Sequence, residues 1–230
     1  MEEIKALAPQ YFEVLFNQTD YLNSFPSLPV KKMLTPEAAA WISRPVSDNE
    51  IKQAVFHLHP EKALGPDGFS ATFFQQNCEV VSLEVTQAIR NFFQYGRMLH
   101  EINHTFLTLV PKTYTTSCLV NFRPISCCNV LYKFISKILA KRMQVVIGEL
   151  ISHNQCAFLK GRSISDCFFL AHELVRDFNK PMGSRMCLKI DLKKAFDVNK
   201  GFVLHIMKCI GFHHLSASGS FLFCHVEWLP

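Results

Sequence analysis

The residue best placed for chemistry is Asp191, a carboxylate that directly follows the apolar run Met186–Ile190. The short apolar run predicts a buried strand with Asp191 at its carboxyl end. A strand would hold this carboxylate rigidly, and carboxylate oxygens are the ligands that divalent cations use in phosphoryl transfer. The same pattern also fits an Asp that caps the helical stretch after it. Position and spacing therefore leave metal binding and helix capping open.

Basic residues are concentrated in the second half of the chain. Residues 1–111 carry 8 Lys and Arg against 12 Asp and Glu, a balance of −4, whereas residues 112–208 carry 16 against 6, a balance of +10. Such a segment favours a polyanionic partner, and nucleic acid is the commonest. Lys133, Lys137 and Lys141 are spaced four apart and form one stripe of a predicted helix. The stripe fits a phosphate track or an ordinary solvated face.

Hydrophobic periodicity predicts a mixed α/β or α+β domain. The clearest helix is expected over residues 129–150, and the β-rich run Thr105–Val110 is expected to form a strand. Ser47 and Glu50 have the spacing of a capping box, and Gly96 should close a helix that starts near Val80. Further helices are expected over residues 4–15, 47–58, 70–77 and 164–178, whereas the four prolines between residues 26 and 45 predict a linker.

The cysteines and histidines carry no recognisable site pattern. The nine cysteines are scattered with no C-x-x-C pair, which favours isolated thiols over a disulfide framework or a zinc site. We do not interpret His57/His59 or the His213–His214 pair as metal sites, and we predict no metal site among the ten histidines. The acidic start is unlike a secretory signal, and no apolar run reaches membrane-spanning length. We therefore expect an intracellular protein of the cytoplasm or nucleus with no membrane contact.

Five motifs, in this order along the chain, resemble those of LINE-type (non-LTR) retrotransposon reverse transcriptases, in wording closest to plant elements. The first has Leu64 where the family often has Pro. The last resembles the family's first catalytic motif: an apolar strand, Asp, variable residues, Lys-Ala, an aromatic residue and Asp. The motifs are Lys62-Ala-Leu-Gly-Pro-Asp-Gly-Phe69, Leu109-Val-Pro-Lys112, Asn121-Phe-Arg-Pro-Ile-Ser126, Asn154-Gln-Cys-Ala-Phe-Leu-Lys-Gly-Arg162 and Lys189-Ile-Asp-Leu-Lys-Lys-Ala-Phe-Asp197.

The resemblance implies a partial right-hand polymerase fold, with helical fingers and an incomplete palm sheet. It divides the chain into an N-terminal helix and Pro-rich linker (1–45), a fingers-like region (46–165), the start of the palm with the first catalytic motif (166–212) and an aberrant tail (213–230). It also implies Mg²⁺ as the cofactor. The implied partners are an RNA template, a DNA primer and deoxynucleotides.

The resemblance also implies roles for particular residues. Asp191 would be catalytic and bind metal, with the main-chain carbonyl of Leu192 beside the nucleotide-side ion. Phe196 would be the steric gate against a ribose 2′-OH, Arg123 would cover the incoming nucleotide, and Lys112 would contact phosphate. The implied nucleic-acid contacts are Lys133, Lys137, Lys141 and Arg162.

The chain contains no Asp-Asp pair, which the family uses for its remaining metal ligands, and the only acidic residue after Asp197 is Glu227. One carboxylate cannot hold two metal ions on a transferring phosphate. We therefore expect a truncated reverse transcriptase domain that is inactive alone. The alternatives are a non-catalytic RNA-binding module that uses the basic fingers, or a subunit completed in trans by another polypeptide.

Overall fold

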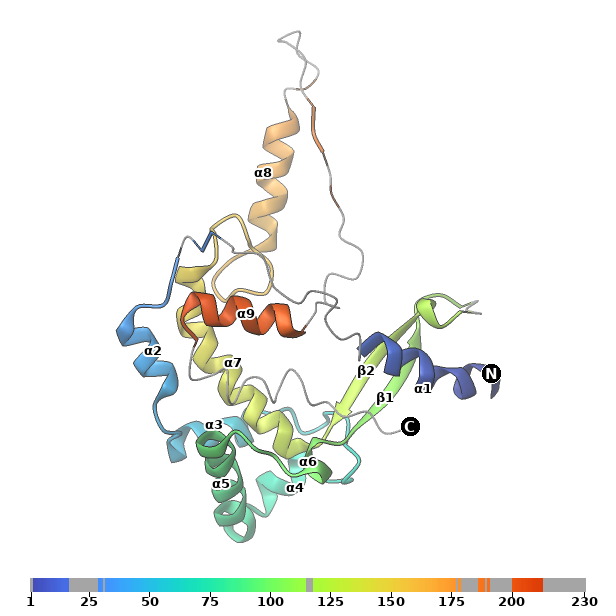
Figure 1. Ribbon diagram of the computed structural model, residues 1–230, viewed down its shortest axis with the longest axis vertical. Helices are drawn as coiled ribbons and strands as arrows, with labels where there is room; N and C mark the ends of the chain where they lie inside the picture. Colours follow the sequence, from blue (N-terminus) through green and yellow to red (C-terminus); the bar gives the residue numbers. More distant parts are fainter. Residues whose placement is uncertain are drawn as a thin grey trace.

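A single long helix, α7, runs through the middle of the computed structural model (Figure 1), which describes residues 2–16, 29–30, 32–114, 118–176, 178, 186–188, 190 and 200–212. Helices surround α7, and a two-stranded antiparallel hairpin projects to one side. The mixed α/β class expected from the sequence is confirmed. The elements are α1 (Glu2–Phe16), α2 (Pro36–Ser43), α3 (Asp48–Phe56), α4 (Ala71–Gln76), α5 (Cys78–Tyr95), α6 (His100–Asn103), β1 (Thr105–Pro111), η1 (Leu119–Asn121), β2 (Phe122–Cys128), α7 (Val130–Leu150), α8 (Ile164–Arg176) and α9 (Lys200–Ile210).

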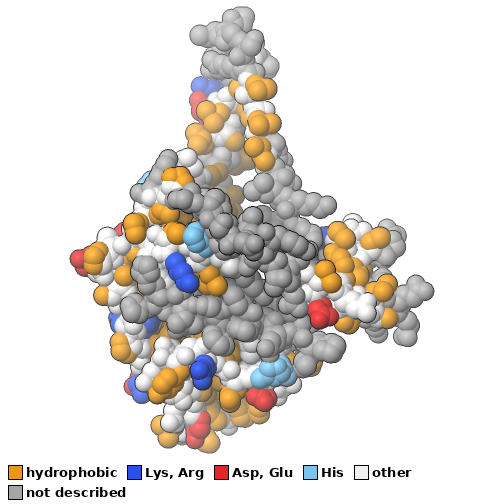
Figure 2. Space-filling model, in the orientation of Figure 1, with side chains coloured by type: hydrophobic (Ala, Val, Ile, Leu, Met, Phe, Trp, Pro, Cys, Tyr) orange, Lys and Arg blue, Asp and Glu red, His pale blue; other side chains and the backbone are white. Residues whose placement is uncertain are grey.

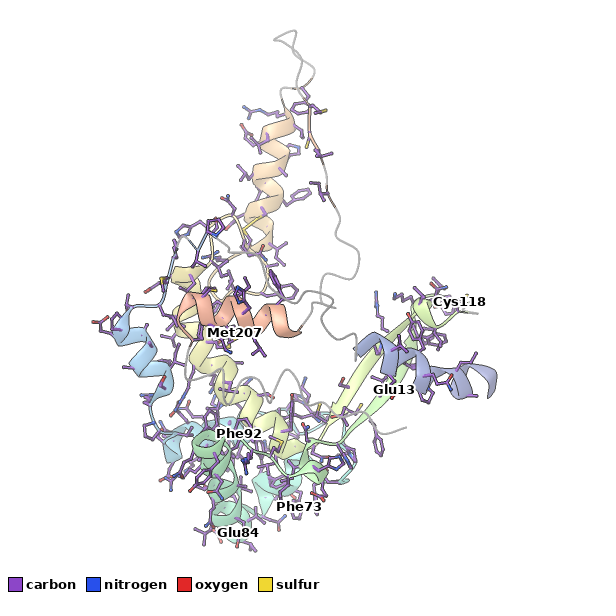
Figure 3. The ribbon with its side chains drawn as sticks, in the orientation of Figure 1. Glu13, Phe73, Glu84, Phe92, Cys118 and Met207 are labelled. Carbon is purple, nitrogen blue, oxygen red and sulfur yellow. A yellow bond between two sulfur atoms is a disulfide. The ribbon has the colours of Figure 1, made fainter. Side chains whose placement is uncertain are left out.

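The hydrophobic core is built around α7. Its apolar stripe packs against α2, α3 and α5, and Phe134 meets Phe74 edge-on with ring centroids 5.5 Å apart. Figure 3 shows Phe92 on α5 and Met207 on α9, and both side chains belong to the same buried cluster. The apolar residues that predict this helix are buried or half-buried except Val145, which is 61% exposed. The buried residues of α7 are Val130, Phe134, Ile135, Ile138, Leu139, Arg142 and Val146.

The predicted helix ends are confirmed where the sequence carries a cap. The Ser47 side chain accepts from the Glu50 N–H, and the Glu50 carboxylate accepts from the Ser47 N–H, which completes the capping box of α3. Gly96 ends α5 in the left-handed conformation, with φ of 66°. Ser70 caps α4 through the N–H of Phe73 at 3.1 Å. Local chemistry thus fixes these boundaries before any tertiary packing is considered.

The Gly-Pro-Asp-Gly turn is pressed against the start of α7. The Gly68 N–H donates to the Gly65 carbonyl at 3.1 Å, and Gly68 has the positive φ of 72° that glycine permits. Asp67 accepts from the Phe69 N–H, as its turn chemistry predicts. Gly65 has no positive φ. It is needed instead for close approach, because a Cβ there would lie 2.1 Å from Oδ1 of Asn129.

One secondary-structure expectation for the proline-containing segments is wrong, and one strand was not predicted. The proline-rich linker contains α2, because Pro36 occupies the first helical turn, where no backbone N–H is required, and the Thr35 side chain caps the helix. The Phe-Arg-Pro-Ile-Ser motif forms strand β2, which the sequence analysis did not predict. Pro124 is tolerated because a two-stranded sheet has only edge strands.

The predicted strand Met186–Ile190 is not formed. Residues 186–188 and 190 have no strand assignment, and Met186, Leu188 and Ile190 are 90%, 74% and 72% exposed. An isolated apolar run gains neither ladder hydrogen bonds nor burial, and within the described ranges the only ladder joins β1 to β2. The expectation of isolated thiols is also wrong at two positions. Cys156 and Cys167 form a disulfide, which joins the loop after α7 to α8.

The buried Arg142 joins α7 to the start of α3. Its side chain is 1% exposed and forms a two-pronged ion pair with Glu50, with N–O distances of 2.8 and 3.0 Å. It also donates to the main-chain carbonyls of Ile42, Arg44 and Pro45 at 2.7–3.1 Å. The ion pair and carbonyl acceptors together satisfy a charge that would otherwise be costly to bury.

The Glu50 carboxyl makes stability depend on pH. Partial burial raises its pKa, but the opposing hydrogen bonds and charge of Arg142, with the bonds from Ser47, bring the pKa to about 2 from an ordinary value of 4.5. Because the folded-state pKa is lowered, the stabilisation is present above about pH 4.5 and is lost as pH falls towards 2. We expect the free energy of unfolding to fall more steeply between about pH 5 and 2 in the parent than in Glu50→Gln. Urea denaturation at stepped pH would measure both slopes, and equal slopes would contradict this role of Glu50.

Candidate nucleic-acid interface

The hairpin brings Lys112 and Arg123 to one face at its projecting end. In the antiparallel register Val110 lies opposite Arg123, and Pro111 lies opposite Phe122. The Lys112 N–H donates to the Asn121 carbonyl at 2.9 Å, so the ladder continues one residue beyond β1. Strand alternation then places Lys112 on the same face as Val110 and Arg123. Diagonal neighbours of this kind lie about 7–8 Å apart, within reach of a common polyanion.

The same face of the hairpin is apolar and exposed. Phe106 is 59% exposed, Ile125 is 48% exposed and Val110 is 37% exposed, and the register places all three side chains on the face of Arg123. Figure 2 shows hydrophobic side chains gathered on the projecting lobe formed by α1 and the hairpin. An exposed aromatic ring on the same face as cations suits nucleic acid, because a base can stack on the ring while phosphates further along the strand contact the charges. We call this surface, made of Phe106, Val110, Lys112, Arg123 and Ile125, the hairpin face.

Lys112 and Arg123 differ in how firmly they are held. The Lys112 ammonium donates to the Val120 carbonyl at 2.8 Å across the projecting end of the hairpin, near Cys118 in Figure 3. The Arg123 side chain is exposed, and no hydrogen bond or ion pair ties its guanidinium to any other described residue. Arg123 thus keeps all of its guanidinium donors for a ligand, whereas Lys112 shares its charge with the loop.

The lysine stripe on α7 is partly structural. The Lys133 ammonium donates to the Ala63 carbonyl, and the Lys141 ammonium donates to the side-chain carbonyl of Gln53 at 3.3 Å. Lys137 lies between them, is half-buried, and contacts no hydrogen-bond acceptor among the residues the structure describes. The phosphate track stays a prediction at all three lysines. At Lys133 and Lys141 the side chain also secures the segment packed against α7.

Arg162 is engaged by the main chain. Its guanidinium donates to the carbonyls of Gly148, Ile151, Ser152 and Gln155. Two of these carbonyls belong to the end of α7 and the residue that follows it, where helical hydrogen bonding leaves acceptors unsatisfied. Arg162 thus closes the loop onto the end of α7. If Arg162 contacts nucleic acid as predicted, its positive charge would attract phosphate while its N–H donors remain bonded to the four carbonyls.

The predicted catalytic residues Asp191, Leu192 and Phe196 lie outside the described residues. Elsewhere, over the ranges described, no three His, Cys, Asp or Glu side chains gather closely enough to hold a metal ion. Asp191, the Mg²⁺ ligand that the resemblance implies, lies outside these ranges, so the magnesium site stays a prediction. Among the helices of the described residues, none is both long enough and apolar enough to cross a membrane.

The sequence analysis missed the apolar part of the hairpin face. Alternation along Thr105–Val110 predicts a strand, but it does not show which of its two faces stays exposed. That outcome depends on β2, whose register places Ile125 opposite Thr108 and Cys127 opposite Phe106. The sequence does show that two motifs, Leu-Val-Pro-Lys and Phe-Arg-Pro-Ile-Ser, are separated by a short connection, which is the spacing of a hairpin.

Strand β2 and the helices α7, α8 and α9 fall within one family match, which includes only the last two residues of β1. Residues 110–213 match the reverse transcriptase (RNA-dependent DNA polymerase) family. This part of the chain therefore matches a reverse transcriptase domain, a polymerase fold of palm and fingers, and its homologues include proteins of non-LTR retrotransposons. The family generally works with a divalent metal, an RNA template and nucleotide substrates.

Particular relatives come from transposable elements. The chain is 28% identical over 156 residues to the transposon TX1 uncharacterized 149 kDa protein of Xenopus laevis, covering 68% of this chain and 12% of that protein. It is 27% identical over 157 residues to the Pol polyprotein of a type-1 R2 retrotransposable element of Nasonia vitripennis, covering 67% of this chain and 14% of the relative. A Drosophila melanogaster R2DM polyprotein is 28% identical over 133 residues, 58% of this chain and 12% of the relative. The matched region thus spans only about an eighth of each relative.

Proposed function

We propose that this chain binds RNA through the hairpin face, as part of a reverse transcriptase domain, and does not polymerise as an isolated 230-residue polypeptide. The observation that carries the binding proposal is the placement of Lys112 and Arg123 on one exposed face of the hairpin, which also carries Phe106 further along β1. The local charge supports it, because residues 112–208 carry a balance of +10. Cations fix the backbone of a polyanion, and an exposed ring offers a base a surface for stacking.

The proposal of inactivity rests on the ligand set. Transfer of a nucleotide by two divalent cations requires several carboxylate oxygens around the ions. We propose Asp191 as one such ligand and Mg²⁺ as the ion, with Leu192 and Phe196 at the nucleotide as the motif implies. The sequence holds no Asp-Asp pair, and beyond Asp197 its only carboxylate side chain is Glu227. The isolated chain therefore lacks the ligands for a second ion.

Primer extension on an RNA template tests the proposal of inactivity directly. The parent chain and Asp191→Ala would be compared with Mg²⁺ and with Mn²⁺, with a complete reverse transcriptase as the positive control. We expect no extension from either chain. Extension by the parent that Asp191→Ala abolishes would overturn this proposal and would mean that another group completes the metal site.

The binding proposal is tested by removing the two cations of the hairpin face. Lys112→Ala/Arg123→Ala should weaken binding to single-stranded RNA and reduce the salt slope by about 0.7 for each phosphate that the chain no longer neutralises. The matched control is Lys52→Ala/Arg97→Ala, which removes the same charge from exposed positions on α3 and after α5, away from the hairpin (Figure 1). Fluorescence anisotropy across a salt series would measure both. Equally weakened binding in the two double variants would show a general charge effect and contradict the hairpin face as the site.

A further inference from the structure

Two imidazoles meet at the junction of α6 and β1. His100 is the first residue of α6, and His104 ends that helix immediately before β1. Their Nε2 atoms lie 3.3 Å apart, and their ring centroids lie 4.1 Å apart with the rings nearly perpendicular. The predictions from the sequence did not include this pair, although Glu101 lies three residues before His104 and the two histidines are four residues apart. Only folding turns the His-x-x-x-His spacing into two convergent nitrogen atoms.

The backbone between the two rings is held in place. Asn129 is 1% exposed, and its side-chain amide donates to the carbonyls of Glu101 and Ile102 at 2.9 and 3.1 Å. Asn103 and Thr105, which flank His104, are each 7% exposed. These hydrogen bonds and this burial fix the main-chain segment that carries both imidazoles to the start of α7. The ring of His100 lies on the exposed side, where water can reach the pair.

The separation of the nitrogen atoms fits coordination by one ion. A tetrahedral Zn²⁺ binds imidazole nitrogen at about 2.0–2.1 Å, so two such ligands should have their nitrogen atoms about 3.3–3.4 Å apart. The observed Nε2–Nε2 distance of 3.3 Å falls in this range. A hydrogen bond between two neutral rings fits the distance as well, because one ring can donate and the other accept. Adding a metal ion distinguishes the two arrangements, because only a coordination site would bind it.

We propose that His100 and His104 bind one divalent transition-metal ion through their Nε2 atoms. Imidazole nitrogen suits Zn²⁺, Ni²⁺ and Cu²⁺, whereas the Mg²⁺ of phosphoryl transfer prefers oxygen ligands. Over the described residues no third His, Cys, Asp or Glu side chain completes a cluster, so the two Nε2 atoms are the ligands that we assign. The ion would clamp α6 to the first residue after it and so stabilise the start of the hairpin.

Isothermal titration with Ni²⁺ tests this site, with the chain's free thiols first blocked by alkylation so that they do not compete for metal. We expect one ion per chain. His100→Gln and His104→Gln should each weaken binding by at least about 10–100-fold, the loss that follows even from changing an outer partner of a metal ligand. The matched control is His172→Gln, an exposed histidine on α8, which should bind Ni²⁺ as the parent does.

A second measurement separates loss of the site from loss of the fold. Ni²⁺ should raise the thermal midpoint of the parent and of His172→Gln but not that of His100→Gln, while circular dichroism confirms that all three chains are folded. The proposal is overturned if the parent binds no Ni²⁺. It is equally overturned if both histidine variants bind Ni²⁺ as tightly as the parent, since other ligands would then be responsible.

Discussion

Replacing Arg142 with Met should lower the free energy of unfolding by about 3–5 kcal/mol, the usual cost of removing one partner from a buried ion pair. Met has a similar length and keeps the apolar contacts of the stem. What it removes is the charge that pairs with Glu50 and the donors to three main-chain carbonyls between α2 and α3. Glu50, whose side chain is only 19% exposed, would keep only the more exposed Arg44, at 3.3 Å, as a charged partner.

Urea denaturation followed by circular dichroism would measure the change in stability. Arg90→Met is the matched control, because Arg90 pairs with Asp48 at 2.6 Å but both side chains are at least half exposed. An exposed pair of this kind contributes about 0–1 kcal/mol, so the control should change little. If the free energy of unfolding of Arg142→Met falls by less than about 1 kcal/mol, water replaces Arg142 as the hydrogen-bond donor to Glu50 and to the carbonyls.

The importance of Arg142 could not be read from the sequence. The residue follows Lys141 in a lysine-rich helix, and local spacing suggests another exposed cation. Its burial is set by Glu50, 92 positions earlier, and by the carbonyls at the end of α2. The local capping box at Ser47 was predictable, but the second use of the Glu50 carboxylate was not. Local signals fixed where helices begin, whereas packing of distant segments decided which charge is enclosed.

The functional residues divide in the same way. The motifs predict that Lys112 and Arg123 belong to the fingers, but their shared face depends on the pairing of β1 with β2, which joins residues 11 to 23 positions apart. Arg162 illustrates the opposite outcome. Its motif suggests nucleic acid, whereas four carbonyls around the end of α7 take up its guanidinium. A basic side chain in a motif can therefore serve the local fold before it serves a ligand.

The strand expected over Met186–Ile190 shows a further limit. Apolar composition predicts burial, but burial needs a surface to pack against, and these side chains are largely exposed. Helices could be predicted without knowing their packing partners, because their backbone hydrogen bonds are local. α1 and α8 were both predicted to within two residues at each end, although α8 buries none of its residues. Sequence pattern is thus a firmer guide to local hydrogen bonding than to the partners of an apolar surface.

Replacing Gly65 with Ala should destabilise the protein by about 3 kcal/mol or more, although the change adds a single methyl group. The new Cβ would lie 2.1 Å from the Asn129 side-chain oxygen and 2.5 Å from the Asn129 main-chain N and Cα. The side chain could move only by losing its bonds to the Asp67 N–H and to two carbonyls of α6. The main chain cannot move cheaply, because it begins α7.

Gly148→Ala is the control with the opposite expected sign. Gly148 lies inside α7 with nothing within 4 Å of an added Cβ, so Ala should stabilise that helix by about 0.5–1 kcal/mol. Thermal and urea unfolding of the two variants would give the comparison. Similar small effects at both positions would mean that the turn relaxes away from α7 without cost.

The Gly65 substitution should also reach the proposed RNA site. Asn129 stands between the last residue of β2 and the first residue of α7, so displacing it moves the base of the hairpin that carries Arg123. We therefore expect Gly65→Ala to weaken RNA binding under conditions where the chain is still folded, and Gly148→Ala to leave it unchanged. Unchanged binding in both variants would show that the Gly-Pro-Asp-Gly turn supports stability alone. Selectively weakened binding in Gly65→Ala would instead show that the turn, through Asn129, sets the angle at which the hairpin face meets its ligand.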